Sequence, residues 1–116
     1  MKKFEDIIAW QKAKGLAVLV YKTFHDSRDF GFKDQIQRAV ISISNNIAEG
    51  FDRHTDKEFR RYLFISKGSC AETKSMLYIA LELSYIDQSQ FENLYNLTSE
   101  VSRLLTGFIK KLTIKD

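Results

Sequence analysis

Basic residues recur between residues 53 and 74 at spacings that bring them to one side of a helix. At about 100° per residue they share an arc of roughly 140° with two aromatic side chains, Phe64 and Tyr78. Cations neutralise phosphates and exposed rings stack unpaired bases, so this pattern favours nucleic-acid binding. The predicted binding residues, called the basic arc below, are Arg53, Lys57, Arg60, Arg61, Phe64, Lys67 and Lys74.

Two other interpretations of these residues stay open. A solvated helix face also carries Lys and Arg, and Phe64 and Tyr78 could instead belong to a contact between subunits. The segment from Arg53 to Lys74 holds six basic and three acidic residues, so one chain offers only a weak site. Strong binding would therefore need several copies acting together.

A second polar pattern lies between residues 38 and 49. Arg38, Ser42, Asn45 and Glu49 recur at spacings of four, three and four, which places them on one stripe of a helix. An Arg paired with a carboxylate more often fixes one packing register than forms a reactive site. We therefore predict a structural polar network made by Arg38, Asn46, Glu49 and Glu72.

The sequence assembles no residues for catalysis or metal binding. His25 and His54 fall in predicted loops, and Cys70 falls on an apolar helix face without a partner to activate it. Paired Glu-x-x-His motifs, zinc-site spacings and phosphate-binding loops are lacking. We predict a protein that is not an enzyme and that needs neither cofactor nor metal.

Four amphipathic helices are predicted to position these residues, because apolar residues recur at spacings of three and four. Gly50 is expected to end the second helix in the left-handed conformation, and Thr55 with Glu58 forms a capping box. Short connections make neighbouring helices antiparallel, so the predicted fold class is an all-α, antiparallel up-and-down four-helix bundle. The predicted helices span Glu5 to Phe24, Lys33 to Glu49, Thr55 to Tyr85 and Asp87 to Leu112.

Length and composition fit one globular domain that spans residues 1–116. Hydrophobic residues make up 44% of the chain and charged residues 28%, and the net charge is only +3. The single cysteine excludes an intrachain disulfide, and no stretch approaches the roughly 20 apolar residues of a membrane span. We expect a cytoplasmic protein without a membrane partner.

Two predicted helices carry more apolar surface than one bundle needs. The fourth helix is apolar over about half of its circumference, from Leu97 and Leu104 round to Tyr95 and Ile109, and the first helix has Ile8 and Leu19 outside its main stripe. Contiguous exposed apolar surface usually marks an interaction site. The sequence therefore predicts a homo-oligomer.

Several motifs resemble the 23S rRNA-intervening sequence proteins, a family of small bacterial four-helix bundles. The resemblance covers nearly the whole chain and includes Trp10 with Ala13, Gly31–Gln35, Arg38-Ala39 with Ser42-Ile43, Asn46-Ile47-Ala48-Glu49-Gly50, Glu58-Phe59, and Gly68-Ser69 followed by Glu72. It implies a homopentamer and association with nucleic acid. Proteins similar to this family accompany the reverse transcriptases of diversity-generating retroelements. Relatives often carry proline in the first loop, whereas this chain has Phe24-His25-Asp26-Ser27-Arg28.

Taken together, these patterns predict an oligomeric protein that associates with RNA, DNA or ribonucleoprotein through the basic arc. One alternative is a protein–protein adaptor for a reverse transcriptase or ribosomal component, without direct nucleic-acid binding. Another is an enzyme of unrecognised type. Salt dependence separates the first two, because phosphate neutralisation weakens steeply with ionic strength and apolar contact does not.

Overall fold

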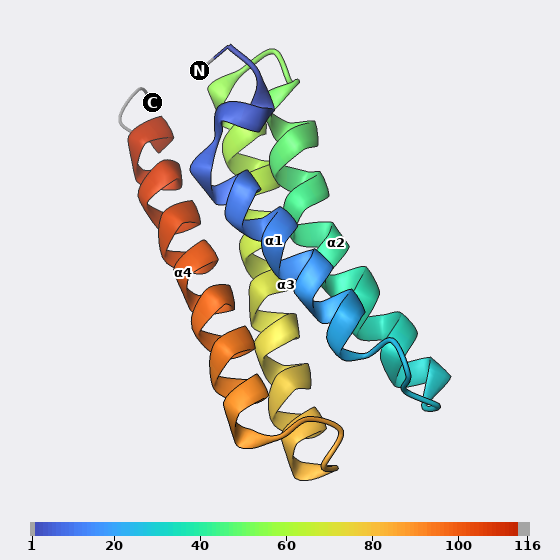
Figure 1. Ribbon diagram of the computed structural model, residues 1–116. Helices are drawn as coiled ribbons and strands as arrows, with labels where there is room; N and C mark the ends of the chain where they lie inside the picture. The colour runs from blue at the N-terminus through green and yellow to red at the C-terminus, as the bar shows by residue number, and fades with distance from the viewer. Residues whose placement is uncertain (1, 114–116) are drawn as a thin grey trace.

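The computed structural model describes residues 2–113 and contains four long helices. Each helix runs antiparallel to the one before it, and the start of the chain and the end of α4 lie at the same end of the bundle (Figure 1). The predicted all-α, up-and-down four-helix bundle is confirmed. A short 3-10 helix, η1 (Phe4–Asp6), precedes α1 (Ile8–Thr23), α2 (Phe30–Phe51), α3 (Asp56–Glu82) and α4 (Gln88–Thr113).

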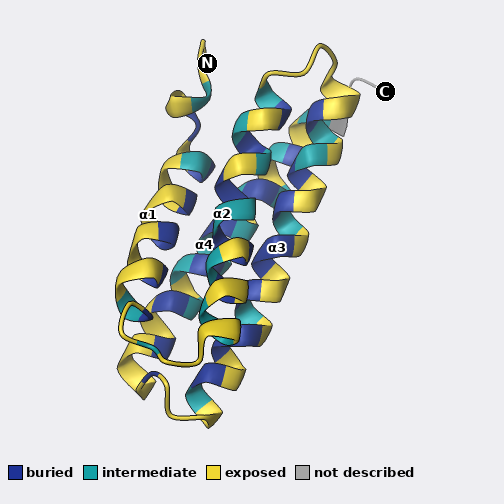
Figure 2. Ribbon diagram, turned by 90° about the vertical axis from the view of Figure 1, so that its right-hand side faces the viewer, coloured by how far each residue is buried: buried dark blue, intermediate teal, exposed yellow. Residues whose placement is uncertain are grey.

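The core runs along the axis of an elongated body of 46 × 20 × 19 Å. Figure 2 shows the buried residues of each helix turned inward and the exposed residues turned outward. The largest fully buried side chains come from all four helices and include Leu16, Ile43, Leu77 and Leu105. Among residues 2–113, no helix combines the length and the apolar character needed to cross a membrane.

The apolar residues that were expected to be in surplus are exposed on α1 but partly buried on α4. Ile8 and Leu19 of α1 are exposed, as expected. On α4, by contrast, Tyr95, Leu97 and Leu104 are partly buried against the core. The expected surplus on the fourth helix is therefore largely used inside the bundle, because α4 packs against both α3 and α1.

Side-chain caps begin α3 and α4, and the cap of α4 is a reciprocal capping box. Thr55 Oγ1 accepts a hydrogen bond from the Glu58 backbone amide at 3.1 Å, and the Thr55 hydroxyl lies 3.5 Å from the Glu58 carboxylate. At the start of α4, Asp87 Oδ1 accepts from the Gln90 amide at 2.8 Å, and Gln90 Oε1 accepts from the Asp87 amide at 2.9 Å. Both predicted helix starts are confirmed. For Thr55 and Glu58 the structure shows the N-cap bond and a contact between the side chains, and not the second backbone bond of the predicted capping box.

Gly50 does not end α2 in a left-handed turn. No glycine among residues 2–113 has a positive φ, and α2 continues through Gly50 to Phe51. A Cβ at Gly50 would lie 2.6 Å from Tyr62 Cβ and 3.0 Å from Phe59 Cδ1. The glycine is therefore needed for the close approach of α3 and not for a turn.

The loop at the start of α2 is joined to the α3–α4 turn. Asp29 caps α2 by accepting from the Phe32 amide at 3.1 Å, and it also accepts from the Tyr85 hydroxyl at 2.6 Å. Ser84 has a φ of 60°, and the Tyr85 amide donates to the Ala80 carbonyl at 2.8 Å. A left-handed residue with this hydrogen bond closes a helix end, so the turn brings Tyr85 to Asp29.

Candidate nucleic-acid interface

The first two turns of α3 bring part of the basic arc together. Lys57 and Arg61 are exposed, Arg60 is half-buried, and the Phe64 ring leaves 55% of its surface exposed. Together with Glu58 these residues line a hollow of about 360 Å³. Three cations beside an exposed ring could neutralise phosphates and stack an unpaired base. We call Lys57, Arg60, Arg61 and Phe64 the α3 cluster.

Arg53 does not line the hollow of the α3 cluster, although it shares the Tyr62 ring with Arg61, which lies 5.8 Å from the ring centre. Arg53 belongs to the α2–α3 loop, where its guanidinium forms an ion pair with Glu49 at 3.0 Å and donates to the Tyr62 hydroxyl. The same guanidinium lies 4.8 Å from the centre of the Tyr62 ring. Arg53 therefore bridges Glu49 at the end of α2 and Tyr62 of α3. A helical projection of α3 could not place it, because Arg53 precedes the start of that helix.

Toward the C-terminal end of α3, side chains on the side of the basic arc pack against α4. The Lys74 ammonium lies 5.0 Å from the Tyr95 ring centre, and the Tyr78 ring packs 5.0 Å from Phe91 and 5.5 Å from Tyr95. A hydrogen bond with Tyr95 raises the pKa of Tyr78 above its usual value. Lys67, one turn beyond Phe64, is half-buried. The arc therefore does not form one continuous open surface: the α3 cluster lines a hollow, whereas Lys74 packs against Tyr95 of α4.

The four residues predicted to form a polar network are not joined to one another in the structure. Arg38 pairs with Asp34 at 2.8 Å and its side chain is 79% exposed, while Glu49 pairs with Arg53. Asn46 donates to the Ser42 carbonyl at 2.7 Å and to its hydroxyl at 2.9 Å. Glu72 is exposed on α3. Arg38 pairs with Asp34, one turn earlier on the same helix, so its ion pair does not involve Glu72 of α3.

A different polar network connects α2 and α3. The Ser66 hydroxyl donates to the Ile43 carbonyl at 2.7 Å, and the Ser69 hydroxyl donates to Ser42 Oγ at 2.8 Å. Because Ser42 also accepts from Asn46, the network reaches the Asn46 amide. From the sequence, Ser66 and Ser69 are expected to let another helix approach closely and to hydrogen-bond to the preceding turn, and Ser69 does donate to the Ile65 carbonyl at 3.3 Å. The position of these two serines on an otherwise apolar face of α3 is the sequence signal that their hydroxyls donate hydrogen bonds to α2.

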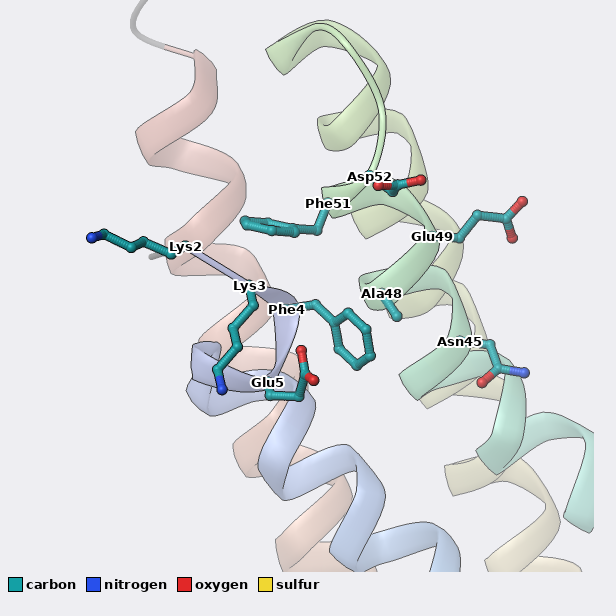
Figure 3. A pocket seen from close by; sticks show the side chains of 9 residues that line it. All are labelled: Lys2, Lys3, Phe4, Glu5, Asn45, Ala48, Glu49, Phe51 and Asp52. Atoms are coloured by element: carbon teal, nitrogen blue, oxygen red, sulfur yellow. The ribbon is translucent and has the colours of Figure 1, made fainter.

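Another hollow lies between η1 and the end of α2. It has a volume of about 710 Å³ and is lined by residues from Lys2 to Glu5 and from Asn45 to Asp52. Figure 3 shows the Phe4 ring directed toward Ala48, whereas the charged ends of Lys2 and Glu49 point away from it. Polar groups do not converge there, as they would in a small-molecule site.

Reactive side chains remain dispersed. Cys70 is buried, and burial raises the pKa of its thiol to about 12, which disfavours a nucleophilic thiolate. His25 and His54 are exposed outside the long helices. Residues 2–113 contain no group of three or more His, Cys, Asp or Glu side chains placed to hold a metal ion.

Comparison with known proteins agrees with this geometry. Residues 5–107 match the family model described as 23S rRNA-intervening sequence protein. A crystal structure of a protein of unknown function from the S23 ribosomal protein family, from Bacteroides thetaiotaomicron, is similar at 28% identity and a TM-score of 0.84. The similarity covers 89% of this chain and 99% of that one. No curated protein matches the chain.

Proposed function

This chain belongs to the 23S rRNA-intervening sequence protein family, and from this premise we propose that it is a non-enzymatic, self-associating protein that binds nucleic acid through the α3 cluster. The observation that carries the proposal is the exposed Phe64 ring beside Lys57, Arg60 and Arg61. Cations hold the phosphates and the ring stacks an unpaired base, so single strands should be preferred over duplexes. Phosphate contacts do not read sequence, so binding should be largely independent of it.

Self-association would convert this small site into an effective one. Exposed apolar residues on α1 and α3 support it, since such patches usually cover one another between chains. In a closed ring every subunit presents the same cluster, and linked contacts can raise avidity by roughly 10²–10⁴. The number five rests on the resemblance to the family alone. The residues are Ile8, Val18, Leu19 and Tyr21 on α1 and Ile65 and Ile79 on α3, and they leave Phe64 free to stack a base.

A protein–protein adaptor for a reverse transcriptase or ribosomal component is the second candidate function. One observation favours it: the exposed apolar residues of α3 flank Gly68, where an added Cβ would meet nothing within 4 Å. Small residues between larger apolar ones let another helix approach closely. On this alternative, Phe64 is covered by a partner protein and is unable to stack a base.

The binding test replaces exposed members of the α3 cluster. Lys57→Glu with Arg61→Glu should weaken binding of labelled single-stranded RNA or DNA at least tenfold at low salt, as measured by fluorescence anisotropy. Both side chains are exposed, whereas Arg60 is half-buried, so this pair should leave the melting temperature nearly unchanged. Loss of two phosphate contacts should also reduce the slope of log affinity against log salt by about 1.4 for single strands.

The matched control is Lys22→Glu with Lys110→Glu, which makes the same charge change at exposed sites on α1 and α4. It should bind nearly as the wild type does. Phe64→Ala should weaken single-stranded more than duplex binding, because paired bases cannot stack on the ring. If the charge-reversed α3 variant binds as well as the wild type, or the wild type fails to bind at low salt, the adaptor function takes first place.

Self-association is measured separately by light scattering over a dilution series. Ile65→Ser with Ile79→Ser tests the α3 face, and Val18→Ser with Leu19→Ser tests the α1 face; all four side chains are exposed. At least one pair should lower the mass without unfolding the chain. A wild-type monomer at micromolar concentration would contradict the oligomer.

A further inference from the structure

The helix α3 carries a second exposed aromatic ring, Tyr78, four turns beyond Phe64. The Tyr78 ring lies 5.0 Å from the Phe91 ring and 5.5 Å from the Tyr95 ring, yet it leaves 52% of its surface exposed. A hydrogen bond with Tyr95 holds its hydroxyl group. Two rings of α4 therefore fix the orientation of an aromatic ring that remains half open to solvent. A rigid, exposed ring is the feature on which unpaired bases stack.

The side of α3 between the two rings contains cations and no acid. Lys67, Ala71 and Lys74 follow Phe64 at spacings of three, four and three, and Tyr78 comes four residues later. At about 100° per residue, these five residues share an arc of roughly 80°. Both lysines are half-buried, and neither forms an ion pair with an acid of residues 2–113. We call these five residues the α3 stripe.

We propose that a single nucleic-acid strand binds along the α3 stripe, with one unpaired base stacked on Phe64 and a second on Tyr78. The two lysines between the rings would neutralise the phosphates that connect these bases. This inference rests on the proposed function, because it extends binding from the α3 cluster and gives the ligand a minimum length. Ile65 and Ile79, which we assign to self-association, each lie about 100° round the helix from the neighbouring ring, so the two surfaces differ.

The spacing of the rings sets the length of strand that reaches both. From Phe64 to Tyr78 the helix rises about 21 Å, at 1.5 Å per residue. A stacked strand covers this distance in about six steps of 3.4 Å, and an extended strand in fewer. Strands of about three nucleotides or fewer are therefore limited to one ring, whereas strands of about seven reach both. The second stacked base should tighten binding by about fivefold or more, which is the low end of what one base contributes.

The first experiment measures how affinity depends on strand length. Unlabelled oligothymidylates of about two to ten nucleotides compete with a labelled strand in fluorescence anisotropy at low salt. Between about three and seven nucleotides, the affinity of the wild type should rise by about fivefold more than that of Tyr78→Leu. This variant keeps an apolar side chain against Phe91 and should bind the shortest strands as the wild type does. Tyr78→Phe keeps the ring and is the matched control, which should show the wild-type length dependence.

A second experiment changes the strand and leaves the protein unaltered. Two strands of about eight nucleotides keep all their phosphates; one carries bases only at its two ends, and the other carries a base at one end only. The wild type should bind the two-base strand about fivefold or more tightly, beyond the roughly twofold statistical gain from two equivalent ends. Tyr78→Leu should show only the statistical gain. Because the wild type alone gives a result, this experiment holds even where the variant fails to fold.

The outcomes separate this inference from the proposed function. An equal length dependence for the wild type and Tyr78→Leu, or only the statistical gain for the wild type with the two-base strand, would overturn binding along the α3 stripe and leave the α3 cluster as the site. Unchanged binding by the protein with Lys57→Glu and Arg61→Glu would overturn both. Light scattering should give the same mass for the wild type and Tyr78→Leu, because Tyr78 lies outside the faces assigned to self-association.

Discussion

Against α2, the helix α3 is held by small residues and hydroxyl groups together with one ring contact, Phe51 on Phe59, whereas against α4 it is held by several aromatic rings. On the α2 side, Gly50 allows close approach, and Ser66 donates to the Ile43 carbonyl at 2.7 Å. On the α4 side, Phe59 meets Phe108 edge-to-face at 5.2 Å, and Tyr78 packs 5.0 Å from Phe91. The α2–α3 contact at Gly50 has no room for an added Cβ. The α3–α4 contact is filled by large aromatic rings.

This difference explains why α3 can present a ring and three cations at its start. Close contact with α2 fixes one side of the helix, and the rings of α4 support another. Lys57, Arg61 and Phe64 then remain exposed on a helix that is held along two sides. The comparison predicts opposite responses to added and removed volume on the two sides of α3.

The largest effect is expected from removing a ring on the α4 side. Phe91 is buried and packs against Tyr78 and Tyr95. Phe91→Ala should lower the free energy of unfolding by about 3–5 kcal/mol, as measured by urea denaturation, because it loses apolar burial and leaves a cavity. Phe91→Leu keeps most of the volume and should cost less than about 1.5 kcal/mol. Equal costs for the two would show that the ring does not fill this contact.

Adding one methyl group on the α2 side should give the next effect. Gly50→Ala forces a Cβ to within 2.6 Å of Tyr62 Cβ, an atom that cannot move without α3. We expect a loss of roughly 1–3 kcal/mol in thermal or urea unfolding, larger than the helix-propensity gain of up to about 1 kcal/mol. Gly15→Ala has open space on α1 and should instead stabilise by about 0.5–1 kcal/mol. Stabilisation by both substitutions would contradict the close contact.

The smallest effects separate buried hydroxyls from surface charge. Ser66→Ala removes a buried donor to α2 and should cost about 1 kcal/mol. Glu49→Gln should change stability by no more than about 0.5 kcal/mol, because its pair with Arg53 is largely exposed. Urea unfolding of both variants compares them directly. A larger loss of stability for Glu49→Gln than for Ser66→Ala would show that the ion pair contributes more to this end of the bundle than the buried hydroxyl does.

Local signals in the sequence predicted four helices and the starts of the third and fourth. The first α-helix begins at Ile8 and not at Glu5, and the second begins at Phe30 and not at Lys33. Thr55 with Glu58 and Asp87 with Gln90 lie three residues apart, so their hydrogen bonds depend on little beyond the chain itself. Gly50 was misassigned because its role depends on Tyr62, which reaches it only when α3 folds back on α2. A turn glycine and a close-packed glycine look the same in one sequence.

The candidate site was partly predictable for the same reason. Lys57, Arg60, Arg61 and Phe64 fall on successive turns of one helix, so periodicity alone placed them together. Arg53 precedes that helix, and its ion pair with Glu49 and contact with Tyr62 could not be read from a projection. Tyr78 and Lys74 were diverted to packing by Tyr95, a residue of another helix.

The buried thiol of Cys70 can report how often the helices of the bundle separate. With a pKa of about 12, only on the order of one thiol in 10⁴ is ionised at pH 8, and the sulfur is shielded from solvent. Labelling by a thiol reagent must therefore wait for the helices to separate around the middle of α3. When reclosing is faster than labelling, the rate gives the equilibrium population of open molecules; when labelling is faster, it gives the opening rate itself.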